Sequence, residues 1–201
     1  MSIQETEPGP AAGRITRLTI LCRGATAANL QTRFSSDDPL LVKEHTHLGK
    51  LAGALRRFDT VLHAPERSAV ETAGALSGNS MPCAALRDVN YGRWNGQRAT
   101  DIAERSPEDL QRWREDPFSA PHGGESFDAA QVRAVAWLQG LHAKGGNTLA
   151  VTHAVILKLL FLQVVGAPLT SIWHIDVEPL GMLVLTSDGR RWTLRRFGPG
   201  R

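Results

Sequence analysis

Residues 15–29, I-T-R-L-T-I-L-C-R-G-A-T-A-A-N, decide the fold. The first eight residues alternate between apolar and polar side chains and then become wholly apolar, which predicts a strand over 15–22. Gly24 follows and suits the tight turn with which a chain leaves a strand. The polar residues from Thr26 to Arg33 are therefore expected beyond the carboxyl end of that strand.

Strand and helix patterns alternate along the rest of the chain. Amphipathic spacing and capping residues predict helices over 48–58, 67–76, 126–141 and 153–165, and one that begins at Ser106 and Pro107. Short apolar runs predict strands over 59–63, 83–87 and 147–152, and a hairpin of 181–186 and 191–197 joined through Asp188-Gly189. This order predicts an α/β fold, a three-layer α/β/α sandwich whose central sheet is mostly parallel with an antiparallel edge strand.

Composition sets the broad class. The chain has 201 residues, 42% hydrophobic and 21% charged, which predicts a flexible leader over 1–13 and a single domain over 14–197 with an insertion at about 97–121. Its 23 Lys and Arg stand against 20 Asp and Glu, without the basic stripe of a nucleic-acid binder. No apolar run approaches the roughly 18 residues of a membrane helix. We expect a cytoplasmic protein without nucleic-acid or membrane partners.

The sequence gives little support for cofactor, metal or thiol chemistry. Cys22 and Cys83 form no C-x-x-C pair and are interpreted as free thiols in a reducing compartment. Arg23 beside Cys22 favours a thiolate, but a cysteine phosphatase needs C-x-x-x-x-x-R, and Ala28 stands at the arginine position. His45 and His47 lie with Glu44 in a polar stretch that is interpreted as a solvated loop. No glycine-rich nucleotide loop is present, so we expect no cofactor and no metal.

Ligands of α/β sheets bind beyond the carboxyl ends of the parallel strands. In this chain those positions follow Cys22, His63, Arg87 and Thr152. Thr26, Asn29 and Arg33 offer hydroxyl, amide and guanidinium groups that suit a phosphate. His153 lies at a strand-to-helix junction, where the helix N-terminus is expected to lower the pKa of its imidazole and leave a neutral ring that donates to an oxyanion.

Several motifs of the chain together resemble one family. They are residues 22–29 (C-R-G-A-T-A-A-N against R-H-G-x-T-x-x-N), 63–73 (H-A-P-E-R-S-A-V-E-T-A against S-S-P-L-x-R-A-x-x-T-A), 86–96 (L-R-D-V-N-Y-G-R-W-N-G against L-x-E-x-x-F-G-x-W-E-G), 123–126 (G-G-E-S, intact) and 151–154 (V-T-H-A against V-x-H-G). Across about residues 17–196 the chain resembles the histidine phosphatase superfamily, the phosphoglycerate-mutase-like proteins. Residues 41–48 look like a short insertion into that pattern.

The resemblance implies phosphoryl transfer through a phosphohistidine on the histidine of R-H-G, with a carboxylic acid that protonates the leaving oxygen. In this chain Arg23 occupies the nucleophile position, Asp88 the acid/base position, and His153 the supporting histidine. A guanidinium cannot act as a neutral nucleophile. The phosphate-binding positions implied are Gly24, Thr26, Asn29, Arg33, Arg67, Ser68 and His153, with Ser68 in place of a clamp arginine and Arg67 one residue early.

Three interpretations follow for the function. The chain is a pseudoenzyme that binds a phosphorylated ligand or a protein partner, a phosphomonoesterase rerouted through His153, His63 or Asp88, or a phosphatase with a single substitution at Arg23. The expected ligand is a small phosphorylated molecule or inorganic phosphate. The sequence leaves open whether the chain forms a homodimer. The tryptophans are expected in the core and the pocket wall, and they are Trp94, Trp113, Trp137, Trp173 and Trp192.

Overall fold

The computed structural model describes residues 15–200, and the predicted leader over 1–13 lies outside these residues. Its strands are β1 (Thr16–Cys22), β2 (Thr60–His63), β3 (Met81–Pro82), β4 (Gly146–Thr152), β5 (Gly181–Ser187) and β6 (Trp192–Pro199). Its α-helices are α1 (Ala27–Leu30), α2 (Val42–Ala54), α3 (Arg67–Leu76), α4 (Ala99–Arg105), α5 (Pro107–Glu115), α6 (Phe127–Gln139) and α7 (Ala154–Val165). The 3₁₀ turns are η1 (Ala84–Leu86), η2 (Gly92–Trp94) and η3 (Leu169–His174).

The strands form one sheet in the order β3-β2-β4-β1-β5-β6. The pairs β3-β2, β2-β4 and β4-β1 are parallel, and β5 is antiparallel to both of its neighbours. The mostly parallel sheet is therefore confirmed, and the reversed strand is β5, one place in from the edge. The central strands β1 and β4 end in fully buried runs because helices cover both faces there.

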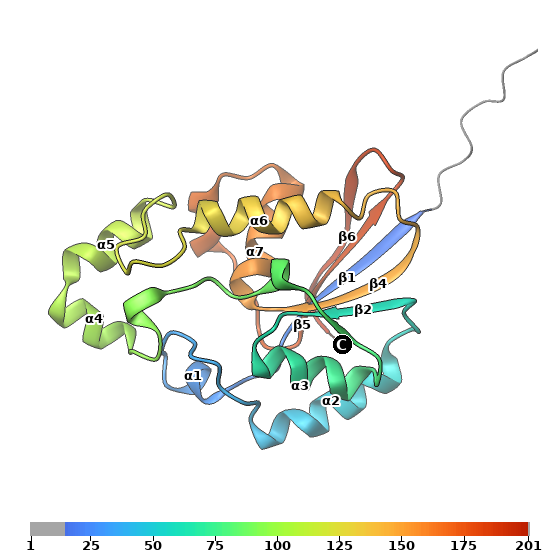
Figure 1. Cartoon of the computed structure of the whole chain (residues 1–201), viewed down its shortest axis with the longest axis horizontal. Helices are drawn as coiled ribbons and strands as arrows, with labels where there is room; N and C mark the ends of the chain where they lie inside the picture. Colours follow the sequence, from blue (N-terminus) through green and yellow to red (C-terminus); the bar gives the residue numbers. More distant parts are fainter. Residues whose placement is uncertain (1–14, 201) are drawn as a thin grey trace, which may run out of the picture.

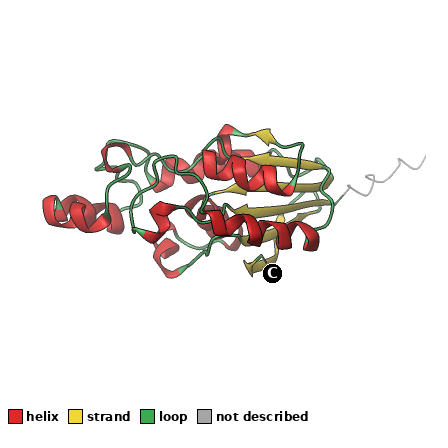
Figure 2. Ribbon diagram, turned by 90° about the horizontal axis from the view of Figure 1, so that it is seen from below, coloured by secondary structure: helices red, strands yellow, loops and turns green. Residues whose placement is uncertain are grey.

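The helices form two layers around the sheet (Figures 1 and 2). Helices α2 and α3 cover one face, while α6 and α7 cover the other, so the predicted α/β/α sandwich is confirmed. Helices α4 and α5 belong to the segment interpreted as an insertion, and they extend beyond the carboxyl ends of the parallel strands (Figure 1). They therefore lie at the end of the sheet where a ligand site was expected.

Two local predictions are wrong. The strand expected at 83–87 is replaced by the turn η1, because side chains occupy its carbonyl groups: Thr152 Oγ1 donates to Leu86 O at 2.6 Å, and Arg133 donates to Ala85 O at 2.7 Å. The polar stretch over 41–48 is not a solvated loop but the first half of α2, which begins at Val42 and ends at Ala54. Its buried face includes Glu44.

The tryptophans divide by depth. Trp94 and Trp113 are buried, as predicted, whereas Trp137 and Trp192 are half-buried. The prediction fails for Trp173, which is 44% exposed at the end of the aromatic cluster, where its Nε1 donates to Arg114 O at 2.8 Å. Its ring packs against Trp113 at 5.0 Å and against Phe127 at 5.7 Å between centroids.

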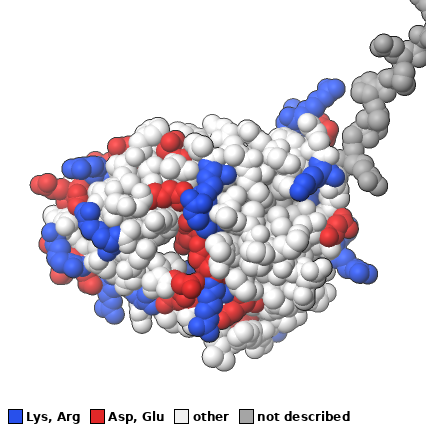
Figure 3. All heavy atoms as spheres, in the orientation of Figure 1, with Lys and Arg blue, Asp and Glu red and all other residues white. Residues whose placement is uncertain are grey.

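The surface carries both signs of charge. On the face drawn in Figure 3, basic and acidic side chains intermingle over the end formed by α4 and α5 and along the middle, and the part over the strands carries few charges. Within residues 15–200, no helix combines the length and the apolar character that crossing a membrane requires.

Candidate active site

Strand register brings two of the candidate residues together. Cys22 pairs with Thr152 across the parallel strands β1 and β4, so the next residues, Arg23 and His153, leave the sheet side by side. The Arg23 backbone N–H donates to Thr152 O at 2.8 Å and continues this pairing by one residue. The polar side chains after the strands thus converge at one edge, as the parallel arrangement predicted.

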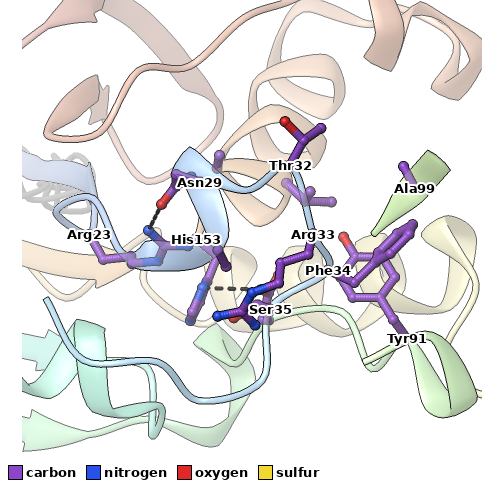
Figure 4. A pocket seen from close by; sticks show the side chains of 13 residues that line it. Arg23, Asn29, Thr32, Arg33, Phe34, Ser35, Tyr91, Ala99 and His153 are labelled. Carbon is purple, nitrogen blue, oxygen red and sulfur yellow. Dashed lines mark hydrogen bonds and ion pairs between the residues drawn. The ribbon is translucent and has the colours of Figure 1, made fainter. Parts of the chain in front are cut away.

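A pocket of about 360 Å³ opens at this edge (Figure 4). Five of the predicted site residues line it, and they are Arg23, Asn29, Arg33, Asp88 and His153. The remaining lining residues are Ala28, Thr32, Phe34, Ser35, Tyr91, Ala99, Ala154 and Val155. These five candidate groups therefore share one cavity with apolar lining residues.

Arg23 is a buried cation in this pocket. Its side chain belongs to a residue only 7% exposed, and its Nη1 donates to Asn29 Oδ1 at 2.7 Å and to Gly24 O at 2.8 Å. Both acceptors are uncharged. The Nε of Arg23 is buried without a hydrogen-bond partner, and within residues 15–200 its guanidinium forms no ion pair. Within the described residues, no carboxylate contacts this guanidinium directly, although its charge helps to lower the pKa of Asp88.

His153 lies between two carboxylates. Its Nε2 is 3.0 Å from Glu66 Oε2, and its Nδ1 is 3.2 Å from Asp88 Oδ2. The Asp88 backbone N–H also donates to Glu66 Oε1 at 3.1 Å, which ties the two acids together. Burial alone would lower the pKa of His153, but the charge of Asp88, its hydrogen bond and then Glu66 raise that pKa to about 9.

The expected low pKa of His153 is therefore wrong. A helix N-terminus does follow the residue, which is the N-cap of α7, but two facing carboxylates outweigh the helix dipole. Burial would raise the pKa values of Asp88 and Glu66, yet the charge and hydrogen bonding of His153 lower both. At neutral pH the cluster is an imidazolium between two carboxylates, and each ring nitrogen faces an acid.

Glu66 is the functional candidate that the sequence interpretation missed. The residue occupies the position of the leucine in the family motif S-S-P-L-x-R, so the comparison of motifs gave no reason to select it. It is the N-cap of α3 and follows β2, the strand that pairs with β4. An acidic residue directly after Pro65 at a strand end was the available signal.

Four predicted phosphate ligands do not line the pocket. Arg67 has a side chain 60% exposed, and its Nε contacts Glu71 Oε1 at 2.7 Å on the surface of α3. Ser68 and Thr26 are buried. The backbone N–H of Gly24 donates to Thr72 Oγ1 at 3.1 Å, so a protein hydroxyl already occupies it.

None of the three alternative nucleophiles, Cys22, His63 and His153, has a suitable environment. Burial raises the pKa of the Cys22 thiol to about 12, although Arg23 lowers it, so the thiolate is not formed near neutral pH. His63 is buried, its Nδ1 is 2.8 Å from Ala64 O, and it does not line the pocket. His153 does line the pocket, but a protonated ring has no lone pair to attack phosphorus.

The intact G-G-E-S motif acts as a brace for the pocket wall. Glu125 accepts from Arg133 Nη2 at 2.7 Å and from Arg87 Nη2 at 3.0 Å, which fastens the loop to α6 and to the segment before Asp88. Gly92 has φ +49°, and a Cβ there would lie 2.3 Å from His122 O. Tyr91 therefore takes its place in the wall through a turn that requires glycine.

Sequence comparisons agree with this fold and site. The chain is 30% identical over 199 residues to a bifunctional protein of Mycobacterium tuberculosis, a match that covers 92% of this chain and 55% of that protein. The chain therefore spans about half the length of this relative. It is also 30% identical over 173 residues to an adenosylcobalamin/alpha-ribazole phosphatase of Salmonella typhimurium, covering 81% of this chain and 86% of that protein.

Solved structures give the same result. The alpha-ribazole phosphatase from Shigella flexneri aligns with a TM-score of 0.81 at 25% identity, covering 92% of this chain and 96% of that one. The profile of the histidine phosphatase superfamily (branch 1) matches residues 18–199, which include the β1 end, Asp88 and His153. The chain belongs to the histidine phosphatase superfamily.

Proposed function

We propose that this protein binds the phosphate group of a small phosphorylated molecule, or inorganic phosphate, and does not transfer it through a phosphohistidine. The observation that carries the proposal is the buried guanidinium of Arg23, whose Nε is unpartnered and which forms no ion pair with any other residue that the structure describes. Arg23 stands where the resemblance places the nucleophilic histidine. The pocket therefore has a cation, Arg23, that can bind an anion. It lacks the histidine that would accept the phosphoryl group.

The free-energy cost of burying the charge of Arg23 explains why an anion is expected to bind there. A buried charge without a partner is unfavourable, and the cost is removed when an oxyanion accepts hydrogen bonds from the guanidinium. Asn29 Oδ1 is taken by Arg23, which leaves the Asn29 amide nitrogen as a donor for the same anion. Arg33 lines the pocket as a second cation, although Asp38 accepts from its Nη2 at 2.5 Å.

The relatives named as phosphatases favour hydrolysis, and the residues of this pocket oppose the family's route to it. A rerouted reaction through His153 needs a neutral ring, whereas Asp88 and Glu66 keep it protonated near neutral pH. Direct activation of water by Asp88 needs a carboxylate able to take a proton, and the lowered pKa of Asp88 makes it a weak base. Binding without phosphohistidine chemistry is the function that these groups support best.

Isothermal titration with phosphate and vanadate tests the proposal. The wild type is expected to bind both anions, and Arg23→Gln is expected to weaken binding by about tenfold or more, since a charge-assisted hydrogen bond is lost. Arg56→Gln is the matched control, because it removes the same charge from an exposed position outside the pocket. Equal affinities in all three proteins would contradict the proposal.

A turnover assay separates binding from hydrolysis. The wild type is expected to release no p-nitrophenol from p-nitrophenyl phosphate above the Arg23→Gln background. The proposal would be contradicted by turnover above that background in independently purified preparations, together with a trapped phosphoenzyme. Another side chain would then act as the nucleophile.

A further inference from the structure

The two ends of the pocket differ in chemistry (Figure 4). Arg23, Asn29 and His153 lie at one end, whereas Phe34, Tyr91 and Ala99 lie together at the other. The charged lining residues are Arg23, Arg33, Asp88 and His153, and every other lining residue is uncharged. A phosphate held at Arg23 would therefore direct the rest of its molecule toward an apolar wall.

This wall is rigid. The Phe34 ring packs against Tyr91 at 4.8 Å, and against Trp94 and Trp113 at 5.4 Å each, between ring centroids. The Phe34 backbone N–H donates to Gln97 O at 3.0 Å, and its carbonyl accepts from Gly96 N–H at 3.1 Å. An aromatic surface fixed in this way offers contact to a ligand without the entropy cost of ordering it.

The charged side chains near the wall already have partners. Arg33 is paired with Asp38, and His153 faces Glu66 and Asp88. Tyr91 is only 6% exposed, and burial raises the pKa of its phenol well above 10, so it stays neutral. Among the described residues, the apolar end of the pocket therefore offers neutral hydroxyl groups, of Tyr91, Thr32 and Ser35, but no unpaired charge to a second carboxylate or an ammonium group on the ligand.

Building on the proposed binding of phosphate, we propose that the pocket selects phosphate monoesters whose organic group is an uncharged, apolar ring. Esters that carry a carboxylate or an ammonium beside the phosphate are disfavoured, because these groups would lose water without gaining a partner of opposite charge. The volume of about 360 Å³ lies near the lower end of the range for small-molecule sites, roughly 300–1,000 Å³. The ligand class is accordingly a phosphate attached to a group of about one ring system.

Titration calorimetry with three defined esters tests the selection. Phenyl phosphate presents an apolar ring, methyl phosphate presents almost no organic group, and phosphoserine adds a carboxylate and an ammonium. Phenyl phosphate is expected to bind about tenfold more tightly than methyl phosphate, because its ring is buried against Phe34 and Tyr91. Phosphoserine is expected to bind no more tightly than methyl phosphate.

A variant at the apolar end locates the effect. Ala99→Leu fills the space beside Phe34 and is expected to weaken phenyl phosphate binding more than methyl phosphate binding, which removes the preference for phenyl phosphate. Thr100→Leu is the matched control, since residue 100 is the exposed neighbour and does not line the pocket. Unchanged thermal unfolding midpoints in both variants show that the folds are intact.

The outcomes separate this inference from the function on which it rests. Equal affinities for phenyl and methyl phosphate, or tighter binding of phosphoserine, would overturn the selection while leaving phosphate binding in place. A phenyl preference that survives in Ala99→Leu would also overturn it, because the ring would then bind elsewhere. Failure of all three esters and of inorganic phosphate to bind would overturn the proposed function itself.

Discussion

Replacing Glu66 by glutamine tests the carboxylate–imidazolium–carboxylate cluster directly. The substitution keeps the size of the side chain and removes one of the two charges that face His153, at Nε2. Asp88 stays in place 3.2 Å from Nδ1. The pKa of His153 is expected to fall below about 9, because Asp88 alone then opposes the lowering effect of burial.

The magnitude follows from proton linkage. A pKa of about 9 against 6.5 corresponds to about 3 kcal/mol of stabilisation of the folded state by the two acids, net of burial. Because the pKa of His153 is raised by folding, this contribution is complete below pH 6.5 and is lost as the pH rises through 9. Glu66 supplies the smaller share, so Glu66→Gln is expected to cost about 1 kcal/mol at pH 6 and nearly nothing at pH 10.

Urea unfolding at pH 6, 7, 8, 9 and 10 measures the free energy of unfolding, and the imidazole resonances of His153 in NMR spectra report its pKa. Glu71→Gln is the matched control on the same helix. Its carboxylate contacts Arg67 and accepts from the Leu40 backbone N–H, not from His153, so this variant is expected to leave the pKa of His153 unchanged.

Two results would refute the reasoning. One is an imidazole of His153 that titrates near 6.5 in the wild type, which would mean that the carboxylates do not hold the proton. The other is a stability difference between Glu66→Gln and the wild type that stays constant from pH 6 to pH 10. Either result would also reopen His153 as a neutral group in the pocket.

Three further predictions concern other parts of the molecule. Arg23→His restores an imidazole at the nucleophile position and is expected to give p-nitrophenyl phosphate hydrolysis above the wild type; a folded variant without this gain would contradict a site one residue short of function. Gly92→Ala is expected to lower the free energy of unfolding in urea by about 3 kcal/mol or more, whereas Gly74→Ala, in a helix with open space, changes it by at most about 1 kcal/mol. The lowered pKa values of Asp88 and Glu66 stabilise the fold above their ordinary values near 4, so stability measured in urea is expected to fall as the pH drops below 4.

Local patterns were sufficient for most of the sheet and its helices. The run from 15 to 22, the helix over 67–76 and the hairpin through Asp188-Gly189 appear within about a residue or two of the predicted limits, because their periodicity and turn chemistry are local properties. Local patterns gave the wrong secondary structure for residues 83–87. The side chains of Thr152 and Arg133 take the carbonyl groups of η1, and both come from distant parts of the chain.

The sequence by itself determined the family, the position of Arg23 where a histidine is expected, and the set of polar residues beyond the strand ends. It determined these because motifs and strand boundaries are written in consecutive residues. Only the tertiary structure decided which of those residues share a pocket: it included Arg33 and left Arg67 on the surface. It also decided the charge of His153, because two carboxylates from separate segments, Glu66 and Asp88, meet its ring and outweigh the helix N-terminus that follows it.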